Sequence, residues 1–173
     1  MIGWEEVRVG EFGFSWVGLA FLLALFVPNL IWTRTARPTG YDPATENRTL
    51  GLLERVGQVA TTAAALLFAD TNTRPWTPWS WWLIAATGLM VTYELTWVRY
   101  FVSDRSMQDF TRPLLGVPVP LAVLPIAAFV LLGIYGPAPA LIVAALILGV
   151  GHIGIHLGHA QEAQRPRDHR PAA

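Results

Sequence analysis

Five long apolar segments, separated by short polar ones, dominate the pattern of this sequence. They cover residues 12–33, 50–69, 79–101, 114–135 and 138–159. Crossing the hydrocarbon core of a bilayer, about 30 Å thick, takes roughly 20 helical residues, and each segment reaches that length. The pattern therefore predicts an all-α integral membrane bundle of five transmembrane helices, with residues 1–160 as one transmembrane domain.

The arginines predict the orientation of this bundle, because cytoplasmic connections retain positive charge during insertion. In the predicted topology only Arg8 and Arg74 fall on one side. Nine fall on the other: Arg34, Arg37, Arg48, Arg99, Arg105, Arg112, Arg165, Arg167 and Arg170. We therefore expect the N-terminus outside and the C-terminus inside, with residues 161–173 as a disordered cytoplasmic tail.

The first apolar segment is expected to stay in the mature protein. Three glutamates and one arginine precede it, where a signal peptide carries a cationic region. Tryptophans near the segment ends fit membrane-interface anchors. The expected outer set is Trp76, Trp79, Trp81 and Trp82, and the expected inner set is Trp32, Trp97 and Tyr100.

Composition supports this class and excludes several functions. Hydrophobic residues make up 53% of the chain and charged residues only 14%. The formal net charge is zero and the basic residues form no patch, so nucleic acid is not an expected partner. The chain has no cysteine, which excludes disulfides and thiol chemistry. All 12 basic residues are arginine, a bias associated with GC-rich bacterial genomes, so we expect a bacterial plasma membrane protein.

Polar residues at membrane depth are the candidate functional residues, because each is costly in lipid. In the predicted topology all of them lie in the cytoplasmic half. They are Asn29, Glu54, Arg55, Gln58, Glu94, His152, His156 and His159, with Arg99 near the end of its segment. Four prolines, Pro113, Pro118, Pro120 and Pro125, further predict a broken helix that lines a cavity.

The last segment has two different faces. His152, His156 and His159 follow i, i+4 and i+7 spacing, so they share one face of a helix. Gly151, Gly154 and Gly158 fall on another face, and small residues in a G-x-x-x-G pattern let membrane helices approach closely. This glycine face is the candidate surface for a homo-oligomer.

The histidine face predicts a polar cavity shared with two carboxylates. If the polar faces of three segments converge, Glu54 and Glu94 meet His152 and His156, and these four could hold a transition metal. A haem is also possible, although one helix cannot supply both axial ligands. Further candidates for the cavity wall are Gln58, Asn29, Arg55 and Arg99.

Three functional classes remain open for this cavity. It could bind a metal ion or small ligand, relay protons in transport by an oligomer, or serve only to hold helices in an assembly or accessory protein. The chain contains no G-x-S-x-G, no H-E-x-x-H and no dense histidine boxes, so enzymatic activity is not favoured.

Several strings resemble a family of small bacterial multi-pass integral membrane proteins. They are Leu53-Glu54-Arg55-Val56-Gly57-Gln58, Tyr93-Glu94-Leu95-Thr96-Trp97-Val98-Arg99-Tyr100-Phe101, Leu132-Gly133-Ile134-Tyr135-Gly136 and Gly149-Val150-Gly151-His152-Ile153-Gly154-Ile155-His156. The resemblance covers about residues 14–159. It implies the architecture and a bacterial membrane location, and it transfers no catalytic residue.

Overall fold

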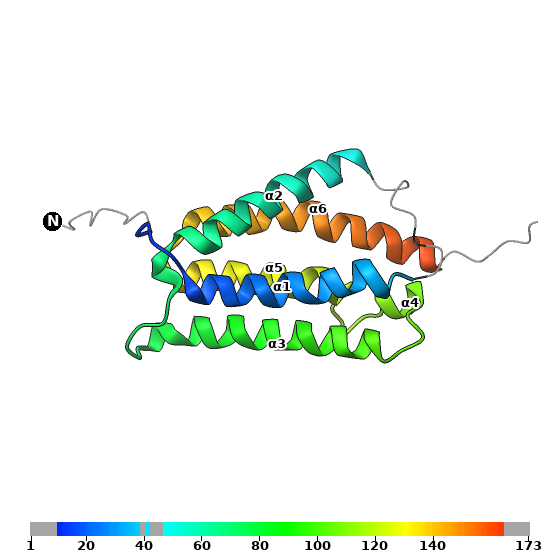
Figure 1. Cartoon of the computed structure of the whole chain (residues 1–173), viewed down its shortest axis with the longest axis horizontal. Coiled ribbons are helices and arrows are strands. Elements are labelled where there is room, and N and C mark those ends of the chain that lie inside the picture. The colour runs from blue at the N-terminus through cyan, green and yellow to red at the C-terminus, as the bar shows by residue number, and fades with distance from the viewer. Residues whose placement is uncertain (1–9, 39–40, 42–46, 165–173) are drawn as a thin grey trace, which may run out of the picture.

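The computed structural model describes residues 10–38, 41 and 47–164, and they form an all-α bundle (Figure 1). No strand occurs among these residues, which confirms the all-α part of the prediction. The elements in chain order are α1 (Trp16–Thr35), α2 (Arg48–Leu67), η2 (Ala69–Thr71), η3 (Pro78–Ser80), α3 (Trp81–Phe101), α4 (Met107–Phe110), α5 (Pro120–Tyr135) and α6 (Pro139–Gln164).

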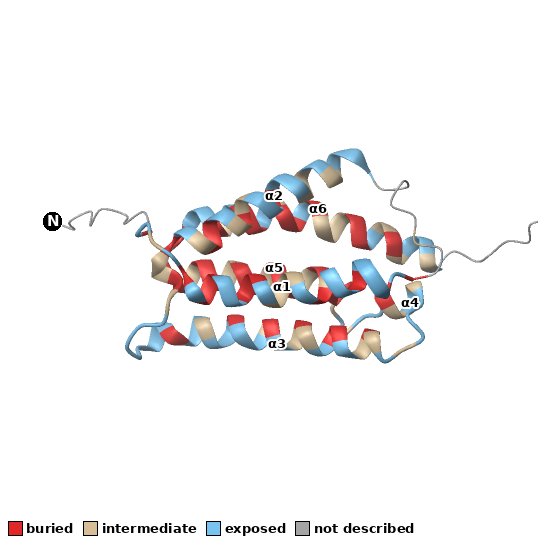
Figure 2. Ribbon diagram, in the orientation of Figure 1, coloured by how far each residue is buried: buried red, intermediate tan, exposed pale blue. Residues whose placement is uncertain are grey.

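Helix α5 is the most enclosed element of the bundle. It packs against α3 on one side and α6 on the other, and α6 packs in turn against α2. Its buried residues face all directions around the helix, because the sequence is apolar throughout. By contrast, α1, α2 and α3 show rows of exposed residues (Figure 2), and many of these are large and apolar.

The predicted helix boundaries need correction at both ends of the chain. Helix α1 begins at Trp16 and not at residue 12, because the Ser15 side chain accepts a hydrogen bond from the Gly18 amide at 2.8 Å and caps the helix. Helix α6 continues to Gln164, so the first four residues of the predicted tail are helical. Residues 165–173 lie outside the described part.

The proline-rich start of the fourth predicted segment is not helical. Residues 114–117 form a turn, and Leu115 and Val119 have positive φ angles of 50° and 40°. Pro120 then occupies the first position of α5, where its missing N–H has no helical partner to lose. Pro125 lies inside α5, which continues through it to Tyr135.

Two of the described helices, α1 and α6, are long and apolar enough to cross a membrane by length and composition. Helix α5 is apolar but shorter. This finding supports membrane association in general, and it does not by itself establish five spans.

Glycines decide how closely α2 approaches its neighbours. A Cβ on Gly57 would collide with the Leu148 backbone, and a Cβ on Gly151 with the Glu54 backbone, so α2 and α6 touch almost backbone to backbone. Near the other end of α2, a Cβ on Gly18 of α1 would collide with the Ala65 carbonyl. From that contact α2 diverges from α1 toward its own N-terminus (Figure 1).

Candidate functional site

A cavity of about 220 Å³ lies where α2 diverges from α1. Its floor and sides also come from α5 and α6, so four helices contribute. The lining residues are Leu25, Phe26, Asn29, Thr33, Glu54, Gln58, Pro125, Ile126, Phe129, Leu148 and His152. Polar groups from α1, α2 and α6 therefore surround an apolar centre supplied largely by α5.

Glu54 and His152 form the main polar contact of this wall. The Nδ1 atom of His152 lies 2.5 Å from Oε1 of Glu54, and the two side chains are 19% and 28% exposed. The close approach of α2 and α6 at Gly151 explains the pairing, because it brings the Glu54 backbone against the turn that carries His152. The sequence predicts both residues in one site, and in the structure their side chains are in contact.

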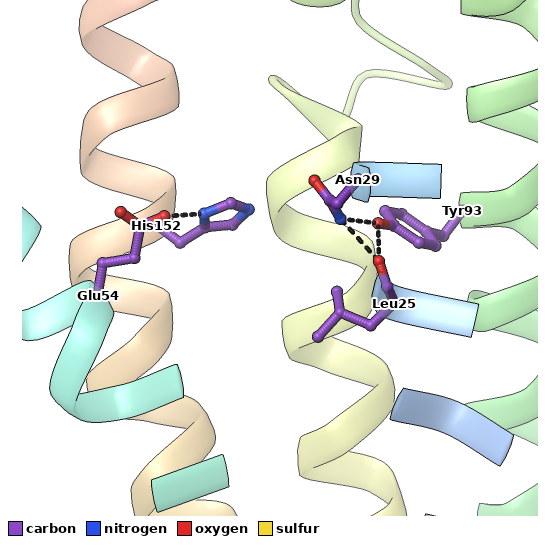
Figure 3. Close-up of polar contacts among 5 residues, drawn as sticks. All are labelled: Leu25, Asn29, Glu54, Tyr93 and His152. Carbon is purple, nitrogen blue, oxygen red and sulfur yellow. Dashed lines mark hydrogen bonds and ion pairs between the residues drawn. The ribbon is translucent and has the colours of Figure 1, made fainter. Parts of the chain in front are cut away.

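Asn29 lies across the cavity from this pair (Figure 3). Its side-chain Nδ2 donates to the Leu25 carbonyl and to the Tyr93 hydroxyl, each at 2.7 Å. The Tyr93 hydroxyl also donates to the same carbonyl at 3.2 Å. This network ties α1 to α3 and fixes the orientation of the Asn29 amide.

His156 lies beside the cavity without lining it. Its ring centroid is 4.5 Å from that of His152 and 5.1 Å from that of Phe110. The ring is buried, and its Nδ1 has no hydrogen-bond partner among the described residues. His159, one turn further along α6, is also buried and lies 3.9 Å from the Glu162 carboxylate.

The expected inner belt of aromatic anchors is instead a buried cluster. Trp32, Trp97 and Tyr100 are at most 9% exposed and contact Phe110 with ring centroids 5.1 to 6.2 Å apart. Helix α4 inserts Phe110 among them, so protein covers these rings at this end of the bundle. The four tryptophans of the expected outer set, Trp76, Trp79, Trp81 and Trp82, are exposed, and their role as interface anchors stays a prediction.

Helix α4 is held by a capping box between Ser106 and Asp109. The Ser106 hydroxyl and amide donate to the Asp109 carboxylate at 2.7 and 3.1 Å, and the Asp109 amide donates back to Ser106 at 3.1 Å. These hydrogen bonds lower the pKa of Asp109. The Ser-x-x-Asp spacing was visible in the sequence and could have predicted this short helix.

The remaining predicted site residues do not join the cavity wall. Glu94 lies on α3, and one carboxylate oxygen is buried with no hydrogen-bond partner in the described part of the chain. Arg55 is exposed on α2. Arg99 donates to the backbone carbonyl of Arg112 at 2.9 Å, where it braces the connection between α4 and α5. Gln58, by contrast, does line the cavity.

The predicted metal set stays a prediction. In residues 10–38, 41 and 47–164, no three His, Cys, Asp or Glu side chains are grouped so that they could hold a metal ion. Glu54 and His152 offer two ligands, with His156 adjacent, while Glu94 is not among the cavity residues. No second described histidine on another helix offers the other axial ligand for a haem.

Sequence reasoning missed Thr33, Tyr93 and Phe129 as part of the site. Thr33 follows Asn29 by one helical turn, so it could have been placed on the same face. Tyr93 and Phe129 reach the site or its support only through packing between distant helices, for which no local signal exists.

No family model, curated protein or solved structure matches this chain. The resemblance to small bacterial multi-pass proteins therefore stays a prediction.

Proposed function

We propose that this chain is a bacterial plasma membrane protein with five spans, its N-terminus outside and its C-terminus in the cytoplasm, whose cavity binds a small ligand. The single observation that carries the ligand proposal is the Glu54–His152 pair in the wall of the cavity. A carboxylate and an imidazole at this depth are costly in lipid, and ligand binding is a reason to retain them.

The outer faces of the bundle support five spans. Exposed large apolar side chains run along four helices, for example Leu23 on α1, Val59 on α2, Leu95 on α3 and Val150 on α6, each more than half exposed. Apolar surface of this extent on several helices is typical of contact with lipid. Helices α2 and α3, with 20 and 21 residues, are about 30 Å long, which matches the hydrocarbon core.

The described arginines support the orientation. Arg34, Arg48, Arg99 and Arg112 lie at the end of the bundle where α1 and α3 finish and α2 begins, and Arg74 lies at the opposite end (Figure 1). The cavity residues Glu54 and Asn29 are nearer the arginine-rich end along their helices. The proposed ligand therefore binds in the cytoplasmic half of the membrane.

Cysteine labelling tests the orientation cleanly, because the chain has no cysteine of its own. Pro137 and Val102 are exposed at opposite ends of the bundle. In intact cells, an impermeant thiol reagent should label Pro137→Cys and leave Val102→Cys unlabelled until the membrane is opened. The reverse pattern would contradict the proposed topology.

Binding of a neutral one-ring probe tests the ligand proposal. A 150 Å³ protein cavity holds benzene, so a cavity of about 220 Å³ has room for 2-phenylethanol. We expect saturable binding of 2-phenylethanol to the protein in nanodiscs, above its partition into empty nanodiscs. Leu25→Trp, which places an indole ring in the cavity wall, should abolish it. Equal binding to this variant would remove the cavity as the site.

A metal ion is the second candidate, and one specific contact favours it. Metal-ligating histidines usually donate their other ring N–H to a carboxylate, and the His152–Glu54 contact has this arrangement. Metal analysis of protein purified without chelators tests it. A stoichiometric transition metal that is lost in His152→Gln supports the metal site, and metal-free wild-type protein removes it.

A further inference from the structure

The polar atoms of the cavity wall that have no hydrogen-bond partner in the described part of the protein are acceptors. This shared property identifies the class of ligand. The class of ligand follows from these atoms only if the cavity binds a ligand, as proposed above. The relevant polar residues are Glu54, His152 and Asn29.

His152 presents a lone pair to the cavity. Its Nδ1 lies 2.5 Å from Oε1 of Glu54. An ionised carboxylate only accepts hydrogen bonds, so beside ionised Glu54 the Nδ1 atom is the one that carries the proton. In the neutral imidazole the other nitrogen, Nε2, is then an acceptor. The ring extends from α6 toward the side on which Asn29 lies (Figure 3), so this acceptor faces the cavity.

Asn29 also presents an acceptor. A carbonyl can only accept, so the atom that contacts the Leu25 carbonyl at 2.7 Å must be the amide nitrogen. Its second proton is directed to the Tyr93 hydroxyl. Both donors of the amide are therefore used, and Oδ1, which points away from Leu25 and Tyr93 in Figure 3, stays available.

Glu54 adds the charge. One of its oxygens accepts from His152, and the carboxylate keeps further acceptor capacity. Among the described lining residues it is the only carboxylate, and none is Arg. The hydroxyl of Thr33 and the amide of Gln58 can donate or accept, so they adapt to either kind of ligand. The wall therefore offers three acceptors and a negative charge, with no fixed donor.

We infer that the cavity binds a small organic ammonium ion with an apolar body. An ammonium group has three donors, no acceptor and a positive charge. Its N–H groups suit the acceptors of His152 and Asn29, which lie on opposite sides of the cavity, and the Glu54 carboxylate behind the His152 ring supplies the opposite charge (Figure 3). The apolar part fits against Leu25, Ile126 and Phe129. The volume of about 220 Å³ sets the size at a single ring or a short alkyl chain, because 150 Å³ holds benzene.

Three one-ring probes separate this inference from its alternatives. Phenethylamine, 2-phenylethanol and 3-phenylpropionate share a ring and differ in charge, and each is dialysed to equilibrium against the protein in nanodiscs and against empty nanodiscs. We expect phenethylamine to bind at least about tenfold tighter than the alcohol, since hydrogen bonds to a charged group are the stronger ones. The anion should not bind.

Two variants of adjacent residues assign the effect to the cavity charge. Glu54→Gln should weaken phenethylamine binding about tenfold or more and leave 2-phenylethanol binding unchanged. Arg55→Gln is the matched control, because Arg55 is exposed beside Glu54 and does not line the cavity. It should leave both affinities unchanged. Retained binding of the alcohol also shows that Glu54→Gln is folded. Asn29→Leu removes a second acceptor from the cavity wall and should likewise weaken phenethylamine binding.

The outcomes are distinguishable. Binding of the alcohol with no preference for the amine would overturn the ammonium inference and leave the cavity as a ligand site. Absence of binding by all three probes would overturn both proposals. Zn²⁺ binding that is lost in Glu54→Gln, without amine binding, would assign the same acceptors to a metal cation and also overturn the inference.

Discussion

Two polar clusters in this bundle differ in how completely their hydrogen bonds are satisfied. The first, which we call the α1–η2 joint, consists of Ser15, Thr71 and Asn72. The Ser15 and Thr71 hydroxyls are 2.6 Å apart, and Asn72 Oδ1 accepts from the Trp16 amide at 2.9 Å while its Nδ2 donates to the Phe14 carbonyl at 3.0 Å. The polar side-chain groups of all three residues form hydrogen bonds with other parts of the protein.

The cavity wall is organised differently. Glu54 and His152 satisfy one another, and Asn29 uses both donors, but each keeps an acceptor that the protein does not use. The joint closes α1 against η2, whereas the cavity lies where α1 and α2 diverge. A polar cluster whose hydrogen bonds are all satisfied holds helices together, whereas unused acceptors beside a cavity indicate a place for a ligand.

A change at the contact between Gly151 and the Glu54 backbone, beneath the cavity wall, should give the largest loss of stability. Gly151→Ala forces α6 away from the Glu54 backbone, and overpacking of this kind costs about 3 kcal/mol in the free energy of unfolding. It should also separate Glu54 from His152 and weaken ligand binding. Unfolding in nanodiscs or detergent, followed by tryptophan fluorescence, measures the loss.

Gly88→Ala is the control for that change. A Cβ on Gly88 meets nothing within 4 Å, so this variant should be no less stable than the wild type. If Gly151→Ala and Gly88→Ala unfold at the same denaturant concentration, the close contact of α2 with α6 is wrong.

The joint should carry stability without carrying binding. Asn72→Ala removes the acceptor of the Trp16 amide and the donor to the Phe14 carbonyl, and we expect a loss of about 2 kcal/mol. Asn47→Ala removes the N-cap of α2, an exposed site, and should lose only about 1 kcal/mol. Both should bind 2-phenylethanol as the wild type does. A loss of 2-phenylethanol affinity in Asn72→Ala would contradict the assignment of stability to the joint and of ligand binding to the cavity wall.

The cavity wall should show the opposite profile. His152→Gln removes one partly exposed hydrogen bond to Glu54, so we expect a stability loss of only about 1 kcal/mol. Phenethylamine binding should nevertheless fall, because the lone pair of Nε2 is gone. Stability and affinity measured on the same preparation decide this. A large stability loss with intact binding would make the pair a structural contact.

Removal of the Ser106 cap of α4, which lies outside both clusters, should give the smallest loss of stability. The pKa of Asp109 is lowered from its ordinary value of 3.8 by hydrogen bonds from Ser106. A lowered carboxyl pKa stabilises the folded state above the ordinary pKa, and this contribution is lost as the pH falls through the folded value. Ser106→Ala should therefore be slightly less stable at neutral pH, and the difference should shrink in acid. A difference that grows in acid would contradict this assignment.

Much of the fold could be predicted from the sequence, because long apolar runs permit few alternatives to helices. The pairing of Glu54 with His152 could be predicted for a related reason. Both side chains are costly at membrane depth, and each gives the other a hydrogen-bond partner. Glu94 obeys the same rule and is not in the cavity. The direction of its face depends on the rotation of α3, which Tyr93 sets through its hydrogen bond with Asn29 of α1 and Trp97 through its ring contact with Phe110 of α4.

The remaining differences also come from contacts between distant parts of the chain. The start of α1 is decided by Ser15 together with Thr71 and Asn72, more than fifty residues away. Trp32 and Trp97 were expected at the membrane interface because tryptophan prefers it, but Phe110 draws them into the bundle. The homo-oligomer through the glycine face stays a prediction, and within one chain Gly151 and Gly154 pack against α2.

Nitrogen NMR of ¹⁵N-histidine-labelled protein in nanodiscs tests the central claim most directly, because it reports which ring nitrogen of His152 carries the proton. His152→Gln assigns the resonances. Under mildly alkaline conditions we predict a protonated Nδ1 and an unprotonated Nε2, with phenethylamine shifting the Nε2 resonance of His152 and leaving His159 unchanged. A protonated Nε2 with a bare Nδ1, or a His152 spectrum that saturating phenethylamine leaves unchanged, would contradict the account of the cavity as an acceptor-lined ligand site.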